Sequence, residues 1–258
     1  MIRAAFFDID GTLLSFRTHR VSEGTVRAFG LLRRRGVRTF IASGRPEVLI
    51  PPMPVEFDGL CTMNGGYVVA DGTVLVSHAI PQDETDRWLR YAADKSVCTM
   101  LFDAHAMFAC HIDATGRAIR DQLGFDMPPE VSAAELLGHE AYQLIAVVPP
   151  EADEELARML PHCRMPRWHK AFTDVIHLDN SKAVGLDNLC RHFGISQADT
   201  VAFGDGANDI EMLQWAGTGV AMGNAADQVK AAADRVTADV DHEGILLAVE
   251  QLIKEGAI

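Results

Sequence analysis

The N-terminal segment constrains the fold most strongly, because short apolar runs alternate there with an amphipathic helix pattern. Residues 2–9 form an apolar run that is too short for most helices and that ends in acidic residues and Gly11. This pattern is typical of a buried parallel strand followed by a loop. Ser22 is placed to cap a helix that Gly36 ends, and residues 37–42 form a second strand. The strand–helix–strand order predicts a parallel sheet with right-handed crossovers.

The middle of the chain follows a different pattern. Between residues 82 and 173 short strands, one of them expected at 164–168, mix with helices, and from residue 175 the strand–helix alternation returns. We therefore expect an α/β fold, a doubly wound parallel-sheet core with an inserted α+β domain. The core is expected to comprise residues 1–81 and 174–258, and the insertion residues 82–173.

Charge and composition restrict the partners of the chain. Its 258 residues carry a formal charge of −13, which suits neither nucleic acid nor an anionic membrane surface. No apolar stretch approaches the roughly 20 residues of a spanning helix, and Asp8 interrupts the N-terminal run before it can serve as a secretory signal. The five cysteines are widely spaced and form no Cys-x-x-Cys pair, a pattern that argues against disulfides and thiolate zinc sites. We expect a cytoplasmic protein with no nucleic-acid or membrane partner; its oligomeric state stays open.

Two carboxylates follow the first predicted strand, in the segment 8–13 (Asp-Ile-Asp-Gly-Thr-Leu). Residues two apart on a strand share a face, so Asp8 and Asp10 can both point into the crevice at the carboxyl end of the sheet, where open α/β sheets bind ligands. Gly11 permits a backbone turn that a Cβ atom would hinder. Two acids and a turn suit a hard cation and a nucleophile, and the alternative is a surface Asp-Gly turn without a chemical role.

A second acidic motif follows a predicted strand at 200–203. The segment 204–209 (Gly-Asp-Gly-Ala-Asn-Asp) again places carboxylates, Asp205 and Asp209, after a buried strand. Oxygen ligands of this kind suit Mg²⁺ better than zinc. The alternative is that Asn208 and Asp209 only cap the next helix, although two acid-rich strand ends in one sheet favour a shared site.

Two further features indicate an anion. Ser43–Arg45 (Ser-Gly-Arg) ends the second predicted strand, where a hydroxyl and backbone N–H groups form a small anion cradle; a plain turn is the alternative. Lys182 is one of only five lysines and lies in the first turn of a predicted helix. Because the helix dipole disfavours a cation there, a phosphate partner would explain its position, and a solvated lysine is the other interpretation.

Together these features resemble the motifs of the haloacid dehalogenase-like (HAD) phosphohydrolases. The stretches that carry the resemblance occur in the same order along the chain: residues 8–13, residues 43–45, Lys182 and residues 204–209. Within that superfamily the chain is similar to the Cof-type branch of sugar-phosphate and related phosphatases, in which a cap domain is inserted between the second motif and the lysine. The stretches 64–66 and 219–225 extend the resemblance. Ala183 departs from it, because many relatives place glycine there.

The resemblance implies Mg²⁺-dependent hydrolysis of a small phosphomonoester, a sugar phosphate or a related metabolite. Asp8 is expected to attack phosphorus and form an aspartyl phosphate, and Asp10 to protonate the leaving group and then activate water. The residues expected to hold Mg²⁺ are Asp8, Asp10 through its backbone carbonyl, Asp205, and Asp209 as a ligand or close beside one. The residues expected to bind the phosphoryl oxygens or position the phosphate are Ser43, Lys182 and Asn208. Thr12 and Arg45 are expected to contact the phosphate and the cap.

Two alternative functions share these motifs. One is a phosphotransferase or mutase that passes the phosphoryl group to a hydroxyl acceptor, and the other is a non-catalytic protein that binds a phosphorylated ligand. The pair Asp8 and Asp10 argues against the second, because a binding protein needs neither a nucleophile nor an acid. The inserted domain is expected to exclude bulk water and to set the leaving-group preference.

Overall fold

The chain folds into two compact units. The computed structural model describes residues 1–123, 128–167 and 169–258; residue 168, at the end of one predicted strand, lies outside the described residues. The core unit comprises residues 1–45, 50–77 and 181–258, and the cap unit comprises residues 46–49 and 78–180. The cap unit is therefore a few residues longer at each end than the expected insertion at 82–173. The assignment of these segments as separate domains stays a prediction.

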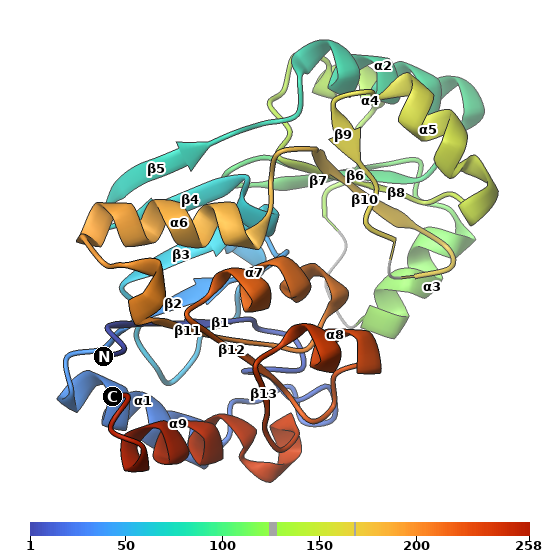
Figure 1. Ribbon diagram of the computed structural model, residues 1–258. Coiled ribbons are helices and arrows are strands. Elements are labelled where there is room, and N and C mark those ends of the chain that lie inside the picture. The colour runs from blue at the N-terminus through green and yellow to red at the C-terminus, as the bar shows by residue number, and fades with distance from the viewer. Residues whose placement is uncertain (124–127, 168) are drawn as a thin grey trace. The chain divides into compact units, whose positions relative to one another are not determined.

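The core unit is built on an eight-stranded sheet with the strand order β13-β12-β11-β1-β2-β3-β4-β5 (Figure 1). Its strands are β1 (Ala4–Phe7), β2 (Arg38–Ala42), β3 (Gly59–Thr62), β4 (Tyr67–Ala70), β5 (Thr73–Ser77), β11 (Thr200–Gly204), β12 (Thr218–Ala221) and β13 (Arg235–Val236). Neighbouring strands from β13 to β3 are parallel, and β4 and β5 add antiparallel pairs. The predicted α/β fold with a mainly parallel sheet is confirmed.

Helices cover both faces of this sheet, as a doubly wound fold requires (Figure 1). They are α1 (Glu23–Arg34), α6 (Lys182–Phe193), α7 (Ile210–Trp215), α8 (Asp227–Ala232) and α9 (Gly244–Lys254). The side chains of β1 alternate between two hydrophobic clusters: Ala5 and Phe7 pack with residues of α1 and α9, and Ala4 and Phe6 with residues of α6 and α7. β1 is buried on both faces and contains only apolar residues. The polar residue Asp8 therefore comes directly after the end of the strand.

Helix α1 begins and ends as its sequence predicts. The Ser22 side chain accepts a hydrogen bond from the Thr25 backbone N–H at 3.0 Å, which satisfies one of the free donors of the first turn. Gly36 has a φ of 72°, a left-handed conformation that ends the helix without a Cβ penalty. Ser22 Oγ also lies 2.5 Å from Glu243 Oε2, next to the start of α9. The residue that caps the N-terminus of α1 therefore also links α1 to α9.

The cap unit contains a five-stranded antiparallel sheet with the order β7-β6-β8-β10-β9. Its elements are α2 (Gln82–Lys95), β6 (Thr99–Phe102), β7 (Met107–Cys110), α3 (Ala114–Leu123), α4 (Ala133–Leu136), β8 (Gln143–Ala146), α5 (Asp153–Met159), β9 (Cys163–Arg164) and β10 (Thr173–His177). Trp88 of α2 and Leu144 of β8 belong to its hydrophobic cluster. Since β10 pairs within this sheet, the cap unit continues to Asn180, and the expected domain boundary at residue 173 stays a prediction.

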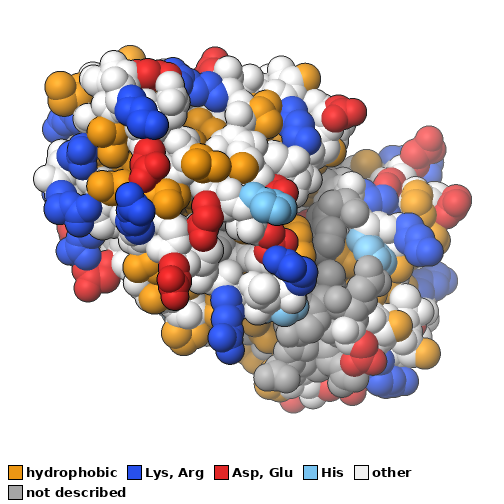
Figure 2. Space-filling view, turned by 90° about the horizontal axis from the view of Figure 1, so that it is seen from below, with side chains coloured by type: hydrophobic (Ala, Val, Ile, Leu, Met, Phe, Trp, Pro, Cys, Tyr) orange, Lys and Arg blue, Asp and Glu red, His pale blue; other side chains and the backbone are white. Residues whose placement is uncertain are grey.

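One face of the molecule carries charges of both signs among its described residues. Figure 2 shows acidic and basic side chains interspersed over one face of the molecule, with no broad area of a single sign. Among the described residues no helix has the length and apolar character needed to cross a bilayer. All five cysteines are free thiols.

Candidate active site

The two acidic motifs meet because the strands that precede them are neighbours. β1 and β11 are parallel, with Phe7 opposite Phe203, and the Asp8 N–H donates to the Phe203 carbonyl at 3.0 Å. Asp8 follows β1 and Asp205 follows β11, so both residues leave the sheet at the same edge. One carboxylate oxygen from each of Asp8, Asp205 and Asp209 lies within 4.8 Å of the others. These three residues, far apart in sequence, form one acidic cluster.

Lys182 lies against this acidic cluster. Its side chain is fully buried, and Nζ donates to Asp8 Oδ1 at 2.6 Å and to Asp209 Oδ1 at 2.5 Å. Ser181 caps the helix that begins at Lys182, its hydroxyl accepting the Val184 N–H. Two carboxylates thus offset the unfavourable placement of a cation at a helix N-terminus. Its expected contact with a phosphoryl oxygen stays a prediction.

The electrostatics of the acidic cluster show a shortage of positive charge. Burial raises the pKa of Asp8 well above its usual value, and nearby Asp209 adds to this rise while Lys182 opposes it. Burial also raises the pKa of Asp205, to about 7. For Lys182, burial lowers the pKa but Asp209 and Asp8 raise it more, so the ammonium stays protonated. Three carboxylates and one ammonium carry a net charge of −2 when all are ionised, which a divalent cation would neutralise.

The donors of the acidic cluster fit a hard divalent cation. Carboxylate oxygens are the ligands that Mg²⁺ prefers. Asp205 is held in place on both oxygens: Thr12 Oγ1 donates to Oδ1 at 2.8 Å and Asn224 Nδ2 donates to Oδ2 at 3.1 Å. Thr12 therefore contacts a candidate metal ligand, and its expected contact with phosphate stays a prediction.

Asp209 has a different environment from that of Asp205. Its Oδ2 accepts the backbone N–H groups of Asp205 and Gly206 at 2.9 and 2.8 Å, and its Oδ1 accepts from Lys182. Both oxygens are thus engaged in shaping the loop and holding the lysine. Asp209 is fully buried whereas Asp205 is partly exposed, and the expected roles of Asp8, Asp205 and Asp209 at a metal stay predictions.

The Asp10 side chain lies outside the acidic cluster. Arg45 forms a two-point ion pair with it, Nε to Oδ2 and Nη2 to Oδ1, both at 2.7 Å. The sequence predicted that Arg45 contacts the cap, and it missed this pair, which holds both carboxylate oxygens in a fixed plane. The expected roles of Asp10 as acid and base, and of its backbone carbonyl as a metal ligand, stay predictions.

The remaining candidate phosphate-binding residues lie on neighbouring loops. Ser43 follows β2, the strand next to β1, and is buried; its hydroxyl accepts the Arg45 backbone N–H at 3.1 Å. Asn208 follows β11 and is exposed, and its Nδ2 donates to Asn64 Oδ1 at 3.0 Å. The order of strands β11, β1 and β2 therefore brings the two loops to the same sheet edge as Asp8.

Sequence reasoning assigned no role to two residues of this site. Asn224 donates to the Gly11 carbonyl at 2.9 Å as well as to Asp205, and so ties the two acidic motifs together. Asn64 receives the Asn208 side chain. Asn224 lies in the stretch 219–225 and Asn64 in the stretch 64–66, and both stretches contributed only to the family resemblance. The one signal of a role in the sequence was a short polar residue beside glycine.

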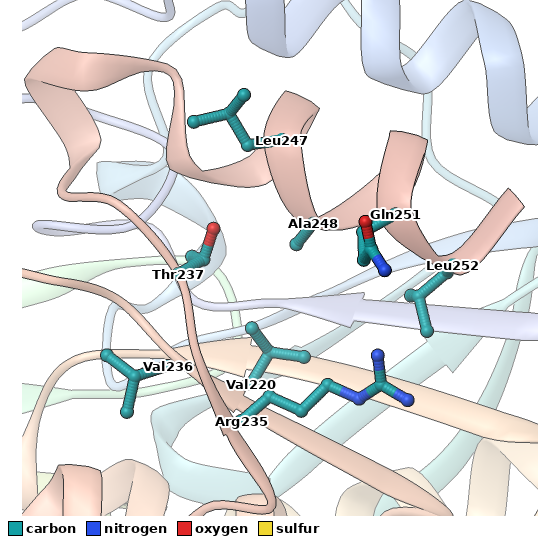
Figure 3. A pocket seen from close by; sticks show the side chains of 8 residues that line it. All are labelled: Val220, Arg235, Val236, Thr237, Leu247, Ala248, Gln251 and Leu252. Atoms are coloured by element: carbon teal, nitrogen blue, oxygen red, sulfur yellow. The ribbon is translucent and has the colours of Figure 1, made fainter. Parts of the chain in front are cut away.

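A separate cavity of about 150 Å³ lies elsewhere in the core unit, between β12, β13 and α9 (Figure 3). Its lining residues are Val220, Arg235, Val236, Thr237, Leu247, Ala248, Gln251 and Leu252. None of them belongs to the acidic cluster or to the loops around it, and the candidate chemistry therefore does not involve this cavity.

Comparison with known proteins identifies the family. The family model described as haloacid dehalogenase-like hydrolase matches residues 5–249, which is nearly the whole chain. This chain belongs to the haloacid dehalogenase-like hydrolases. Within them it is a member of the Cof-type, subclass IIB phosphatase branch, as the motifs predicted.

Individual HAD relatives match over almost their full length. The protein YkrA of Bacillus subtilis (strain 168) is 34% identical over 256 residues, 96% of each chain. The pyridoxal phosphate phosphatase YbhA of Escherichia coli (strain K12) is 30% identical over 260 residues, covering 92% of this chain and 93% of the relative. The solved structure of the HAD subclass IIB sugar phosphatase BT4131 is 37% identical, covers 99% of this chain and 100% of its own, and superposes with a TM-score of 0.87.

Proposed function

We propose that this protein is an Mg²⁺-dependent phosphatase that hydrolyses a small phosphomonoester through an aspartyl-phosphate intermediate on Asp8. The observation that carries the proposal is the meeting of Asp8, Asp205 and Lys182 at one sheet edge, in a chain of the HAD phosphatase type. A nucleophile, a cation site and a fixed ammonium are the three elements that phosphoryl transfer requires of a protein.

The residues of the chain perform the reaction in two displacements. In the first, an Asp8 oxygen attacks phosphorus, the bond from phosphorus to the ester oxygen breaks, and Asp10 gives its proton to the departing alkoxide. In the second, Asp10 takes a proton from water, the water oxygen attacks phosphorus, and the bond to Asp8 breaks with its electrons returning to the carboxylate. Lys182, already in contact with Asp8 at 2.6 Å, stabilises the negative charge at the phosphoryl group, as do Ser43 and Asn208.

The cation site and the acid are held by different contacts. Asp8 and Asp205, with the Asp10 carbonyl and with Asp209 close by, would hold Mg²⁺, which supplies positive charge to the phosphoryl oxygens when bound. Arg45 holds the ionised Asp10 carboxylate by two hydrogen bonds, which is the form that takes a proton from water in the second displacement. The Asp10 carboxylate is thus kept apart from the carboxylates that would hold the metal.

The substrate class follows from charge and from the relatives. A chain with a formal charge of −13 binds a small anion only where local cations gather, and Lys182 beside the cation site provides such a place. The sugar phosphatase BT4131 and the pyridoxal phosphate phosphatase YbhA both have names that specify small phosphorylated metabolites. We therefore propose a sugar phosphate or a similar metabolite as substrate.

The test is phosphate release from a panel of phosphorylated sugars and related metabolites, with Mg²⁺ or with EDTA. We expect Mg²⁺-dependent turnover, and a loss of at least about 1000-fold in kcat for Asp8→Asn, because the amide cannot act as the nucleophile. Thermal denaturation checks that the variant is folded. Unchanged turnover in Asp8→Asn would rule out the proposed mechanism, and transfer of phosphate to an added alcohol in preference to water would indicate a phosphotransferase.

A further inference from the structure

The turn after β3 has an unusual backbone. Met63, Asn64 and Gly65 form a turn with φ values of 48°, 53° and 91°, so three consecutive residues have positive φ. Two of the three are not glycine. Strained conformations of this kind persist only where the surrounding contacts determine them, and they cluster at functional sites. The strained backbone therefore indicates that the contacts of this turn serve the function of the site.

The first contacts of the turn are with the Ser43 loop. The Asn64 N–H donates to the Ser43 carbonyl at 3.0 Å and the Met63 N–H donates to the Arg45 carbonyl at 3.2 Å. The left-handed backbone is what directs these two successive N–H groups toward the neighbouring loop. The turn thus sets the position of the loop that carries the Ser43 hydroxyl.

The second contact is made by the Asn64 side chain. It is 4% exposed, and its Oδ1 accepts a hydrogen bond from Nδ2 of Asn208 at 3.0 Å. Asn208 is itself exposed, so this bond to a buried acceptor restricts the directions in which its amide points. A buried asparagine therefore orients an exposed one at the sheet edge where Asp8 lies.

The third contact is with the residue before Lys182. A Cβ atom on Gly65 would lie 2.1 Å from the carbonyl oxygen of Ser181, so the turn packs closely against the start of α6. The turn hence contacts the segments that carry Ser43, Asn208 and Lys182, the three candidate phosphate-binding residues.

We propose that Asn64 is a positioning residue of the phosphoryl site: through its side chain it orients Asn208, and through its backbone it holds the Ser43 loop against the start of α6. The inference deepens the proposed function and rests on it, because it assigns the turn to the binding of the transferring phosphoryl group. Asn64 need not touch the substrate; it acts through the groups that do.

The experiment separates the side chain of Asn64 from its backbone. Asn64→Gly removes the side-chain acceptor but adopts the left-handed conformation without strain, whereas Asn64→Ala removes the acceptor and keeps a Cβ atom. We expect Asn64→Gly to keep the melting temperature of the parent while kcat/KM falls about 10- to 100-fold, with the loss in kcat at least as large as the rise in KM. Asn64→Ala should show at least the same loss in activity together with a lower melting temperature, because it also strains the backbone that holds the Ser43 loop.

A double-mutant cycle tests the route through Asn208. If Asn64 acts by orienting Asn208, the double variant Asn64→Gly/Asn208→Ala should lose no more activity than Asn208→Ala alone. Full additivity of the two losses, or Asn64→Gly with the kcat/KM of the parent, would overturn the proposal. If Asn64 had a purely structural role, activity would fall only in variants with a lower melting temperature. Asn64→Gly separates the two quantities, because it is expected to lose activity at the melting temperature of the parent.

Calorimetric binding of inorganic phosphate in the presence of Mg²⁺ gives a readout that does not depend on turnover. Asn64→Gly is expected to bind phosphate about tenfold more weakly than the parent. Equal affinity in the two proteins would overturn the positioning role, even if the parent hydrolyses no ester. A parent that binds phosphate in an Asn64-dependent way but shows no turnover would contradict only the proposed function, and a parent that does neither would contradict both.

Discussion

Lys182 shows how one buried side chain can organise a site. It is the only fully buried lysine among the described residues, and its ammonium is shared between Asp8 and Asp209. Isolated buried charges are costly, and removal of one partner from a buried ion pair is strongly destabilising because the other charge is left without compensation. Lys182 consequently contributes to the folded state as well as to the proposed chemistry.

Lys182→Met tests this at the residue scale. The substitution keeps the volume of the side chain but leaves Asp8 and Asp209 without their cation, so we expect the free energy of unfolding to fall by about 3 kcal/mol and turnover to be lost. Urea denaturation followed by circular dichroism measures the stability. Lys254→Met, at an exposed position of α9, is the control and should be neutral; equal stability of the two variants would contradict the assigned role.

At the scale of elements, the loops after the strands bring the functional groups together. Gly11, after β1, has a φ of 85°, and a Cβ atom there would lie 2.2 Å from Asp205 Oδ2. The loops after β1 and β11 therefore approach more closely than any other residue at position 11 would allow. Asn224 in the loop after β12 holds the same two loops together by bonds to Gly11 and Asp205.

Gly11→Ala should consequently displace the Asp205 carboxylate. We expect Mg²⁺ binding, measured by calorimetry, to weaken at least about tenfold, together with a loss of turnover. Gly72→Ala is a matched control, because Gly72 has a φ of 70° but no neighbouring atom within 4 Å of the point that a Cβ atom would occupy. It imposes a similar backbone strain without a clash, and so should lower stability without changing Mg²⁺ affinity. The same affinity loss in both variants would mean that strain alone is responsible.

For the whole molecule, the charge balance links stability to pH and to cations. The pKa of Asp205 in the folded protein is raised from 3.8 to about 7, chiefly by burial, and that of Asp8 is raised as well, also chiefly by burial. A raised pKa means that the folded state binds the proton more tightly than the unfolded chain does. Its contribution to stability is therefore complete below about pH 3.8 and is lost as the pH rises through about 7.

The metal-free protein should accordingly become less stable between pH 4.5 and 8, measured as the melting temperature in EDTA. Asp205→Asn should reduce this decline, whereas Asp94→Asn at an exposed position should not. Mg²⁺ should raise the melting temperature more at pH 8 than at pH 5, because a protonated carboxyl group binds the ion poorly. A melting temperature that rises with pH in EDTA, or a larger effect of Mg²⁺ at pH 5, would contradict the assigned cation site.

Sequence patterns alone were sufficient to predict the alternating core, the inserted α+β segment and the family. Burial periodicity and strand-end motifs are local properties of the chain, so they can be recognised without the structure. They also placed Asp8 and Asp205 at one sheet edge, since parallel neighbouring strands end together. Only the tertiary structure decided which side chains pair there: Lys182 with Asp8 and Asp209, Arg45 with Asp10, and Asn64 with Asn208. The direction of a side chain depends on close approach between distant loops, and no local pattern encodes that approach.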